Sequence, residues 1–249
     1  MLTVALLYPE LLGLYGDRGN ALVLLQRARW RGLPIRLRSL ALHDAIDPQK
    51  LDILLIGGGQ DRDQSLVSAA LMRQAPALRE LIAAAVPVLA VCGGYQLLGH
   101  SYRDASGRVS PGAGLLDLET VAGRGRLIGN AVVEVHLDGC RRRLVGFENH
   151  LGRTRLGAGL RPFGRVLIGH GNDGRSGWEG CWAGAVIGTY LHGPLLPRNP
   201  WLADHLLALA CRHRGLHPVL APLEDRLELQ AHRLAEQVAA RQWRHLGLR

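Results

Sequence analysis

Short apolar runs separated by amphipathic stretches dominate the first hundred residues of the chain. Three of these runs, at residues 2–8, 52–56 and 86–91, have the length of a β-strand and almost no polar alternation, and Ile35–Leu40 is a fourth strand candidate. Strands that are apolar throughout are buried on both faces, as in a parallel sheet with helices on each side. The pattern therefore predicts an α/β fold whose mostly parallel sheet has helices on both faces.

Helical periodicity fills the intervals between these strands. In the first expected helix, Ala21–Arg31, the apolar positions are Leu22, Leu25, Ala28 and Trp30. Proline removes a backbone donor and rarely lies inside a helix, so Pro76 is expected to separate two helices. The helices expected after the first one are 66–72, 78–85 and 94–101.

Beyond residue 103 the composition and the pattern of apolar residues change. Residues 103–185 are rich in glycine and arginine and contain only short strand candidates, which favours a mixed or antiparallel extension of the sheet; these candidates are Ala131–His136, Leu144–Phe147, Arg165–Gly169 and Ala183–Thr189. Helices return at Trp201–Arg214 and Leu223–Leu246. We expect one domain over residues 1–205 and a C-terminal helical extension, 206–249, packed on the same domain.

The charge of the chain is strongly basic. Among its 249 residues the formal net charge is +9, and Lys50 is the single lysine. A basic surface attracts nucleic acid, anionic lipid or an acidic partner. The arginines are dispersed and no nucleic-acid-binding motif is present, so we expect no nucleic-acid partner.

Neither a membrane span nor a metal site is indicated. No run of eighteen apolar residues occurs, and the first residues resemble a strand more than a signal peptide, so a cytoplasmic location is expected. The four cysteines, Cys92, Cys140, Cys181 and Cys211, are widely separated, without zinc-ligand spacing. We therefore expect no disulfide framework and no metal.

The clearest candidate for catalysis is Cys92. It ends the apolar run 86–91, and Gly93 and Gly94 separate it from a helical pattern. A strand-to-helix turn exposes a nucleophile at the edge of a sheet, where backbone N–H groups can bind an oxyanion. The glycines at 57–59 follow another strand, so both turns are expected at the same edge.

A thiol nucleophile needs a base, which is usually histidine. His192, which closes the apolar strand Ala183–Thr189 and precedes a Gly-Pro turn, is the best placed of the eleven histidines. His150 is the second candidate.

Three motifs resemble those of class I (Triad) glutamine amidotransferases, in their CobB/CobQ-like branch. They are Cys-Gly-Gly-Tyr-Gln at 92–96, Gly-Gly-Gly-Gln-Asp at 57–61 and Gly-Thr-Tyr-Leu-His-Gly at 188–193. Stretches at 8–20, 126–130 and 146–150 further resemble the GatD glutaminase subunits of lipid II isoglutaminyl synthases. The resemblance covers about residues 1–205 and implies a flavodoxin-like, three-layer fold.

The resemblance also implies roles for individual residues. Cys92 would attack the side-chain amide of L-glutamine to form a thioester, and His192 would move the proton. The oxyanion would be held by N–H groups of Gly93 and of the Gly58–Gly59 turn, where one donor is typically worth about 3 kcal/mol. Gln96 would contact the bound glutamine, and Arg126 would form a bidentate contact with the α-carboxylate of that glutamine.

One departure concerns the acid behind the histidine. Most class I members have His-x-Glu, but Pro194 stands two residues after His192. Glu148 is a candidate for the missing acid, and a partner subunit is another source. Ala90, where many relatives have glycine, is a second and milder departure.

The chain contains no Gly-x-x-x-x-Gly-Lys-[Ser/Thr] loop. ATP and Mg²⁺ are therefore expected in a separate partner, and no cofactor is expected here. By resemblance, that partner is MurT, a Mur-ligase-like subunit that amidates D-glutamate of lipid II, which would bring the chain to the inner face of the membrane. Three alternatives stay open: a glutaminase serving a corrinoid or nucleotide acceptor, a non-enzymatic subunit with a degenerate site, and a cysteine peptidase on the same fold.

Overall fold

The computed structural model describes residues 1–13, 16–59, 64–216 and 219–245. Its centre is a six-stranded sheet in the order β11-β12-β4-β3-β1-β2, parallel except for β11, which pairs antiparallel with β12. The bounds of these strands are β1 (Leu2–Leu7), β2 (Ile35–Leu40), β3 (Ile53–Ile56), β4 (Val88–Val91), β11 (Cys181–Ala183) and β12 (Val186–Thr189). This confirms the predicted parallel sheet, whose strands β1, β3, β4 and β12 are buried throughout.

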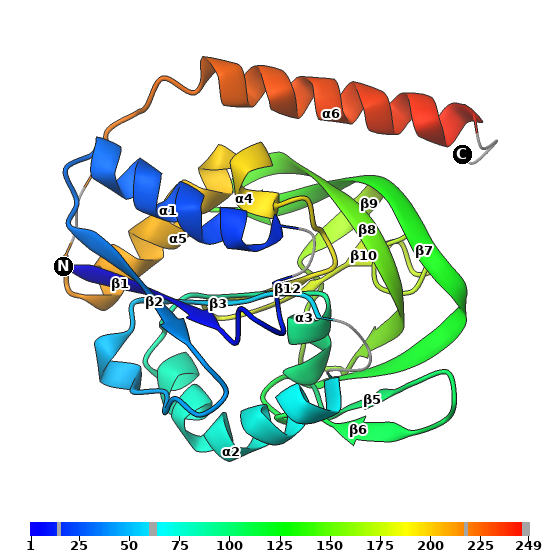
Figure 1. Ribbon diagram of the computed structural model, residues 1–249. Helices are drawn as coiled ribbons and strands as arrows, with labels where there is room; N and C mark the ends of the chain where they lie inside the picture. The colour runs from blue at the N-terminus through cyan, green and yellow to red at the C-terminus, as the bar shows by residue number, and fades with distance from the viewer. Residues whose placement is uncertain (14–15, 60–63, 217–218, 246–249) are drawn as a thin grey trace.

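Helices cover both faces of this sheet (Figure 1). α1 (Arg18–Trp30) and α5 (Pro200–His213) pack with one face, and α2 (Gln64–Ala83) packs with the other, each forming its own apolar core. Shorter helical segments are η2 (Pro48–Lys50), α3 (Gly93–Leu97) and α4 (Leu195–Arg198). The three predicted layers are therefore present.

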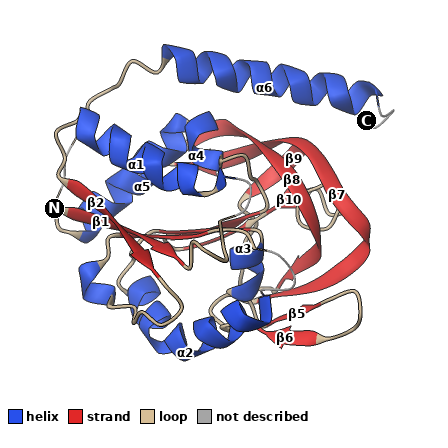
Figure 2. Cartoon of the chain, viewed as in Figure 1, coloured by secondary structure: helices blue, strands red, loops and turns tan. Residues whose placement is uncertain are grey.

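Most of the region 103–185 forms a second sheet beside the first (Figure 2). Its strands are β5 (Ser101–Arg103), β6 (Val109–Pro111), β7 (Leu118–Leu137), β8 (Cys140–Leu156), β9 (Gly164–Ile168) and β10 (Trp178–Glu179). β7 and β8 form one long antiparallel hairpin, so the short strands predicted near its tip were fragments of it. Exposed arginines and glycines along both strands interrupt the hydrophobic signal there.

Two helix predictions were wrong. α2 runs unbroken through Pro76, which lies on its exposed side, where water can satisfy the carbonyl that proline leaves without a donor. In α1 the predicted apolar positions Leu22 and Trp30 are 53% and 57% exposed, whereas Leu24 is buried with Leu25 and Ala28.

The C-terminal helix α6 (Arg226–His245) lies across α4 and the β7–β9 side of the second sheet (Figure 1). The predicted domain boundary at residue 205 falls inside α5, which contributes buried residues to the main core on both sides of that position, as far as Cys211. After α5, the described part of the predicted extension is the single helix α6, which packs on α4 and on the second sheet. The predicted residues from Leu246 onward lie outside the described ranges.

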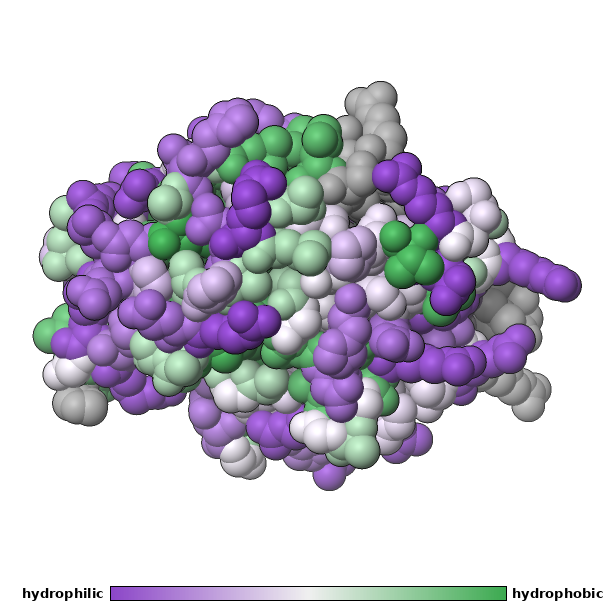
Figure 3. Space-filling model, turned by 90° about the horizontal axis from the view of Figure 1, so that it is seen from below, coloured by the Kyte–Doolittle hydropathy of each residue, from purple (hydrophilic) through white to green (hydrophobic). Residues whose placement is uncertain are grey.

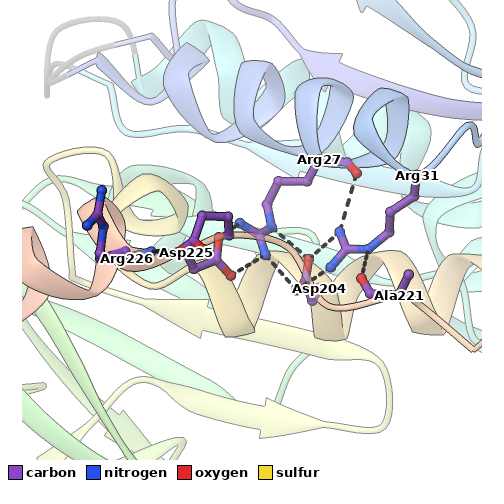
Figure 4. A network of polar contacts seen from close by, with 7 residues as sticks. Arg27, Arg31, Asp204, Ala221, Asp225 and Arg226 are labelled. Atoms are coloured by element: carbon purple, nitrogen blue, oxygen red, sulfur yellow. Dashed lines mark hydrogen bonds and ion pairs between the residues drawn. The ribbon is translucent and has the colours of Figure 1, made fainter.

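A buried guanidinium ties this segment to the main fold (Figure 4). Arg27, 2% exposed, bonds Asp204 of α5 at 2.7 Å and Asp225, which precedes α6, at 2.5 Å. Arg31 also bonds Asp204, at 2.8 Å. The network therefore joins α1, α5 and the start of α6.

The surface carries apolar residues in small groups. On the lower face, where α2 and the β5–β6 pair lie in Figure 1, green hydrophobic residues are interspersed with purple hydrophilic ones in Figure 3. Such mixing is ordinary for a folded chain. No helix in the described ranges is long and apolar enough to cross a membrane.

Candidate active site

The turn at Cys92 connects β4 to α3 at the C-terminal edge of the central sheet. Cys92 has φ 50° and ψ −108°, a conformation that L-residues rarely adopt. Its N–H donates to the carbonyl of Thr189 on the neighbouring strand (2.8 Å), and its carbonyl accepts from the N–H of Gln96 (2.9 Å). These bonds hold the strained turn, which presents a half-buried thiol at the sheet edge.

Two glycines allow the close packing around this turn. A Cβ added at Gly94 would lie 2.6 Å from the Ile56 side chain, so α3 can approach β3 only with glycine there. A Cβ added at Gly58 would lie 2.8 Å from His192 Cε1 and 3.3 Å from Cys92 Cβ. Three predicted site residues, Cys92, His192 and Gly58, therefore meet at one point.

His192 is fully buried just beyond the end of β12. Its backbone exchanges two hydrogen bonds with Phe147 of β8, which fixes the imidazole where the two sheets meet. Burial lowers the pKa of His192, but hydrogen bonds to Asp17 and Cys92, together with their charges, outweigh it and raise the pKa to about 10. The ring therefore favours the imidazolium form beside the thiol.

The acid that faces His192 is Asp17, which was not among the predicted site residues. Asp17 is 2% exposed, and its Oδ1 lies 3.5 Å from His192 Nδ1. Its Oδ2 accepts a hydrogen bond of 2.8 Å from the N–H of Gly58. Asp17 is the residue that precedes α1, yet its side chain makes no capping bond to that helix. Its position beyond β1, at the same sheet edge as Cys92, was the available signal.

This contact changes the expectation for the oxyanion donors. Because Gly58 already donates its N–H to Asp17, the remaining predicted donors are Gly59 and Gly93. Gly93 is the first residue of α3, where the N–H has no partner within the helix. The motif residues Gln60 and Asp61 lie outside the described part of the chain.

Gln96 belongs to a buried polar network behind Cys92. Its Nε2 donates to Tyr190 Oη at 3.0 Å, and this hydroxyl lies 2.6 Å from Thr154 Oγ1. His150, the second candidate base, stacks on the Tyr190 ring with centroids 3.6 Å apart. Its Nδ1 lies 2.8 Å from the carbonyl of Gly152, and burial is the main cause that lowers its pKa to about 3. His150 is therefore neutral at physiological pH.

Glu148 and Arg126 have partners other than those predicted. Both carboxylate oxygens of Glu148 accept backbone N–H groups, from His170 (2.7 Å) and Gly171 (2.8 Å). Asp17 thus takes the place at His192 that was suggested for Glu148. Arg126 is exposed and donates to the side chain and carbonyl of Asn149, at 2.6 and 2.9 Å.

Among the residues described, no three His, Cys, Asp or Glu side chains lie close enough to hold a metal ion. The site is thus a thiol, an imidazole and a carboxylate grouped around Gly58. Such a group can carry out acyl transfer through a covalent thioester.

Residues 3–200 match the family model of the CobB/CobQ-like glutamine amidotransferase domain. The chain belongs to the CobB/CobQ-like glutamine amidotransferase family. It is 37% identical to a protein of Staphylococcus aureus (strain N315), over 97% of both chains. It is 35% identical to one of Streptococcus pneumoniae (strain ATCC BAA-255 / R6), over 95% of this chain and 90% of the other. Both relatives are named lipid II isoglutaminyl synthase (glutamine-hydrolyzing) subunit GatD.

Solved structures of this family's fold are also similar. The glutaminase domain of Trypanosoma brucei CTPS with bound acivicin superimposes with a TM-score of 0.55 at 12% identity, covering 89% of this chain and 97% of that one. A Thermotoga maritima glutamine amidotransferase gives a TM-score of 0.52 at 17% identity, over 96% and 98%. These structural similarities confirm the predicted fold, and the family model matched over residues 3–200 confirms the family predicted from the motifs.

Proposed function

We propose that this chain is a glutaminase that hydrolyses L-glutamine to glutamate and ammonia, as a subunit of a lipid II isoglutaminyl synthase. The observation that carries the proposal is the grouping of Cys92, His192 and Asp17 around Gly58. The GatD relatives, which match nearly the whole chain, support the choice of reaction.

In the first step the thiolate of Cys92 attacks the side-chain carboxamide carbon of glutamine. The resulting oxyanion accepts hydrogen bonds from the N–H groups of Gly59 and Gly93. His192 donates its proton to the leaving nitrogen, so ammonia departs and a γ-glutamyl thioester remains. Water then attacks the thioester, returning its proton to His192, and glutamate leaves with Cys92 regenerated.

Three further residues support this chemistry. The carboxylate of Asp17 orients the imidazole and stabilises the imidazolium, the role of the acid in a nucleophile-histidine-acid triad. Gln96, on α3 directly after the nucleophile turn, is proposed to contact bound glutamine. Arg126 is proposed to bind the α-carboxylate, which requires it to exchange a bond with Asn149.

The ammonia is proposed to reach a Mur-ligase-like partner of the MurT type, in a heterodimer. That partner would use ATP and Mg²⁺ to activate the α-carboxyl of D-glutamate in the stem peptide of lipid II, and ammonia would convert it to D-isoglutamine. The reaction would take place in the cytoplasm, at the inner face of the membrane that holds the lipid.

A second candidate is the same glutaminase serving a corrinoid acceptor. A cobyric acid synthase of Pelotomaculum thermopropionicum (strain DSM 13744 / JCM 10971 / SI) is 36% identical over 66% of this chain. That match spans only 33% of the synthase, whereas the GatD matches span 90% or more of those proteins. The GatD-like assignment is therefore favoured.

The direct test is steady-state ammonia release from L-glutamine, measured for the chain alone and with a MurT-like partner. Cys92→Ser should abolish release, and Cys140→Ser, which changes an exposed cysteine of β8, should leave it unchanged. Absence of release under both conditions, or equal activity of the two variants, would contradict the proposed glutaminase.

A labelling experiment separates an active site from a degenerate one. A glutamine analogue with an electrophilic side chain should modify Cys92, as identified by peptide mass spectrometry, and excess L-glutamine should protect it. Labelling of Cys140 in preference to Cys92 would indicate a non-enzymatic subunit.

Amidation of lipid II, but not of a corrinoid acid, in the reconstituted complex would identify the acceptor.

A further inference from the structure

An arginine-lined hollow lies on the second sheet, where β7 and β8 meet the turn at 173–175. Its volume is about 490 Å³. In the described part of the chain, no ion pair joins any of its four arginines to a carboxylate; these are Arg124, Arg153, Arg155 and Arg175. The arginine pocket, as we call it, therefore collects positive charge, with Asp173 as the one acid among the described residues that line it.

The acid that also lines the arginine pocket is already engaged. Asp173 Oδ1 accepts hydrogen bonds from the backbone N–H groups of Arg175 and Ser176, both at 2.8 Å, and from the Ser176 hydroxyl at 2.9 Å. These bonds hold the carboxylate within its own turn. None of these bonds joins the carboxylate of Asp173 to a guanidinium group of the arginine pocket.

Arg153 is fixed in place by the backbone. Its Nη1 donates to the carbonyl of Leu151 at 2.8 Å, and its Nη2 donates to that of Gly125 at 3.1 Å. The guanidinium packs so closely on Gly123 that a Cβ there would lie 2.6 Å from Arg153 Cζ. The β7 bulge, which begins after Ala122, is thus built around Arg153 and carries Arg124.

The positive charge of the arginine pocket affects a neighbouring histidine. Burial lowers the pKa of His170, and the charge of Arg153 lowers it further. Like charges around one hollow repel one another, so an anion that enters gains from all of them together. A planar guanidinium fork matches the oxygens of a phosphate in two places, and the volume admits more than one phosphate group.

We propose that the arginine pocket is a binding site for a phosphate-bearing ligand, with a diphosphate as the group that fits its charge and volume. The ligand could be a soluble nucleotide or pyrophosphate, or the phosphate of a lipid-linked molecule. Gly152, beside Arg153 on β8, approaches the Gln96 amide so closely that a Cβ there would lie 2.4 Å from it. Because successive residues of a strand face opposite sides, the ligand would lie across β8 from the buried polar network that contains Gln96.

The test is titration calorimetry of the full chain with pyrophosphate. The triple variant Arg124→Gln, Arg155→Gln, Arg175→Gln should bind about 100-fold more weakly, because it loses several charge-assisted contacts. Arg153 is left unchanged because it holds the bulge. A control with the same charge change at exposed arginines elsewhere, Arg29→Gln, Arg38→Gln, Arg233→Gln, should change binding less than about threefold, a screening-level effect.

Sedimentation with lipid vesicles distinguishes a lipid-linked phosphate ligand from a soluble one. Binding to phosphatidic acid vesicles that needs the three arginines and is displaced by pyrophosphate supports a lipid-linked ligand. Pyrophosphate binding without vesicle binding supports a soluble one. Unchanged affinity in the pocket triple, or equal losses in both triples, overturns the proposal. Ammonia release and melting temperature check that each variant is folded, and Arg124→Gln alone replaces the triple if it is not.

Discussion

Asp17→Asn isolates the contribution of the carboxylate that faces His192. The amide oxygen of asparagine can still accept the hydrogen bond from the Gly58 N–H, so the turn at Gly58 should keep its shape. What disappears is the negative charge 3.5 Å from His192 Nδ1. The substitution therefore tests electrostatics with little change in packing.

The size of the effect follows from the pKa of His192. Its rise from 6.5 to about 10 corresponds to about 5 kcal/mol in favour of the imidazolium. Asp17 and Cys92 share this stabilisation, so we assign about half of it, 2 to 3 kcal/mol, to Asp17. A loss of that size lowers kcat by roughly 30- to 150-fold.

The assay is ammonia release from glutamine as a function of pH. Because the raised pKa keeps His192 protonated up to about pH 10, removing Asp17 should move the basic limb of kcat/KM toward neutral pH. The rate at which iodoacetamide alkylates Cys92 gives a second readout that needs no partner subunit. Asp44→Asn, at an exposed aspartate in another loop, is the control. An unchanged pH profile with unchanged kcat would refute this role of Asp17.

Three other substitutions test the fold and the site. Arg27→Met should lower the free energy of unfolding by about 3 to 5 kcal/mol in urea titrations, because it leaves two carboxylates without their buried partner, whereas Arg29→Met at an exposed neighbour should change little. Gly58→Ala should remove most glutaminase activity and lower the melting temperature modestly, since the new Cβ would displace the buried imidazole of His192; full activity would contradict the tight packing there. Glu148→Gln should flatten the pH dependence of stability: burial is the main cause that raises the pKa of Glu148 from 4.5 to about 7, so the stability this group contributes is complete below pH 4.5 and about 3 kcal/mol is lost as pH rises through 7. Equal slopes for wild type and variant between pH 5 and 8, in urea unfolding, would show that Glu148 is not the source.

The parts of the fold that the sequence predicted well rest on local signals. β1, β3 and β4 are apolar runs whose burial needs no partner to be recognised, and the Cys92 turn is marked by the two glycines that follow a strand. The hairpin β7–β8 was underestimated because exposed arginines break its pattern, and its pairing is visible only across the two strands. α2 was divided at Pro76 because local propensity ignores the tertiary packing that keeps the helix continuous.

At the active site, too, local sequence signals and tertiary contacts each account for different residues. The sequence by itself indicated Cys92 and His192 as the candidate nucleophile and base, because each lies in a short motif that follows a strand, and those motifs indicated the family. Only the tertiary structure showed that Asp17, 175 positions before His192, places its carboxylate beside the imidazole and accepts the Gly58 N–H. Contacts between residues so far apart depend on how strands order within a sheet, which no local pattern of side chains records.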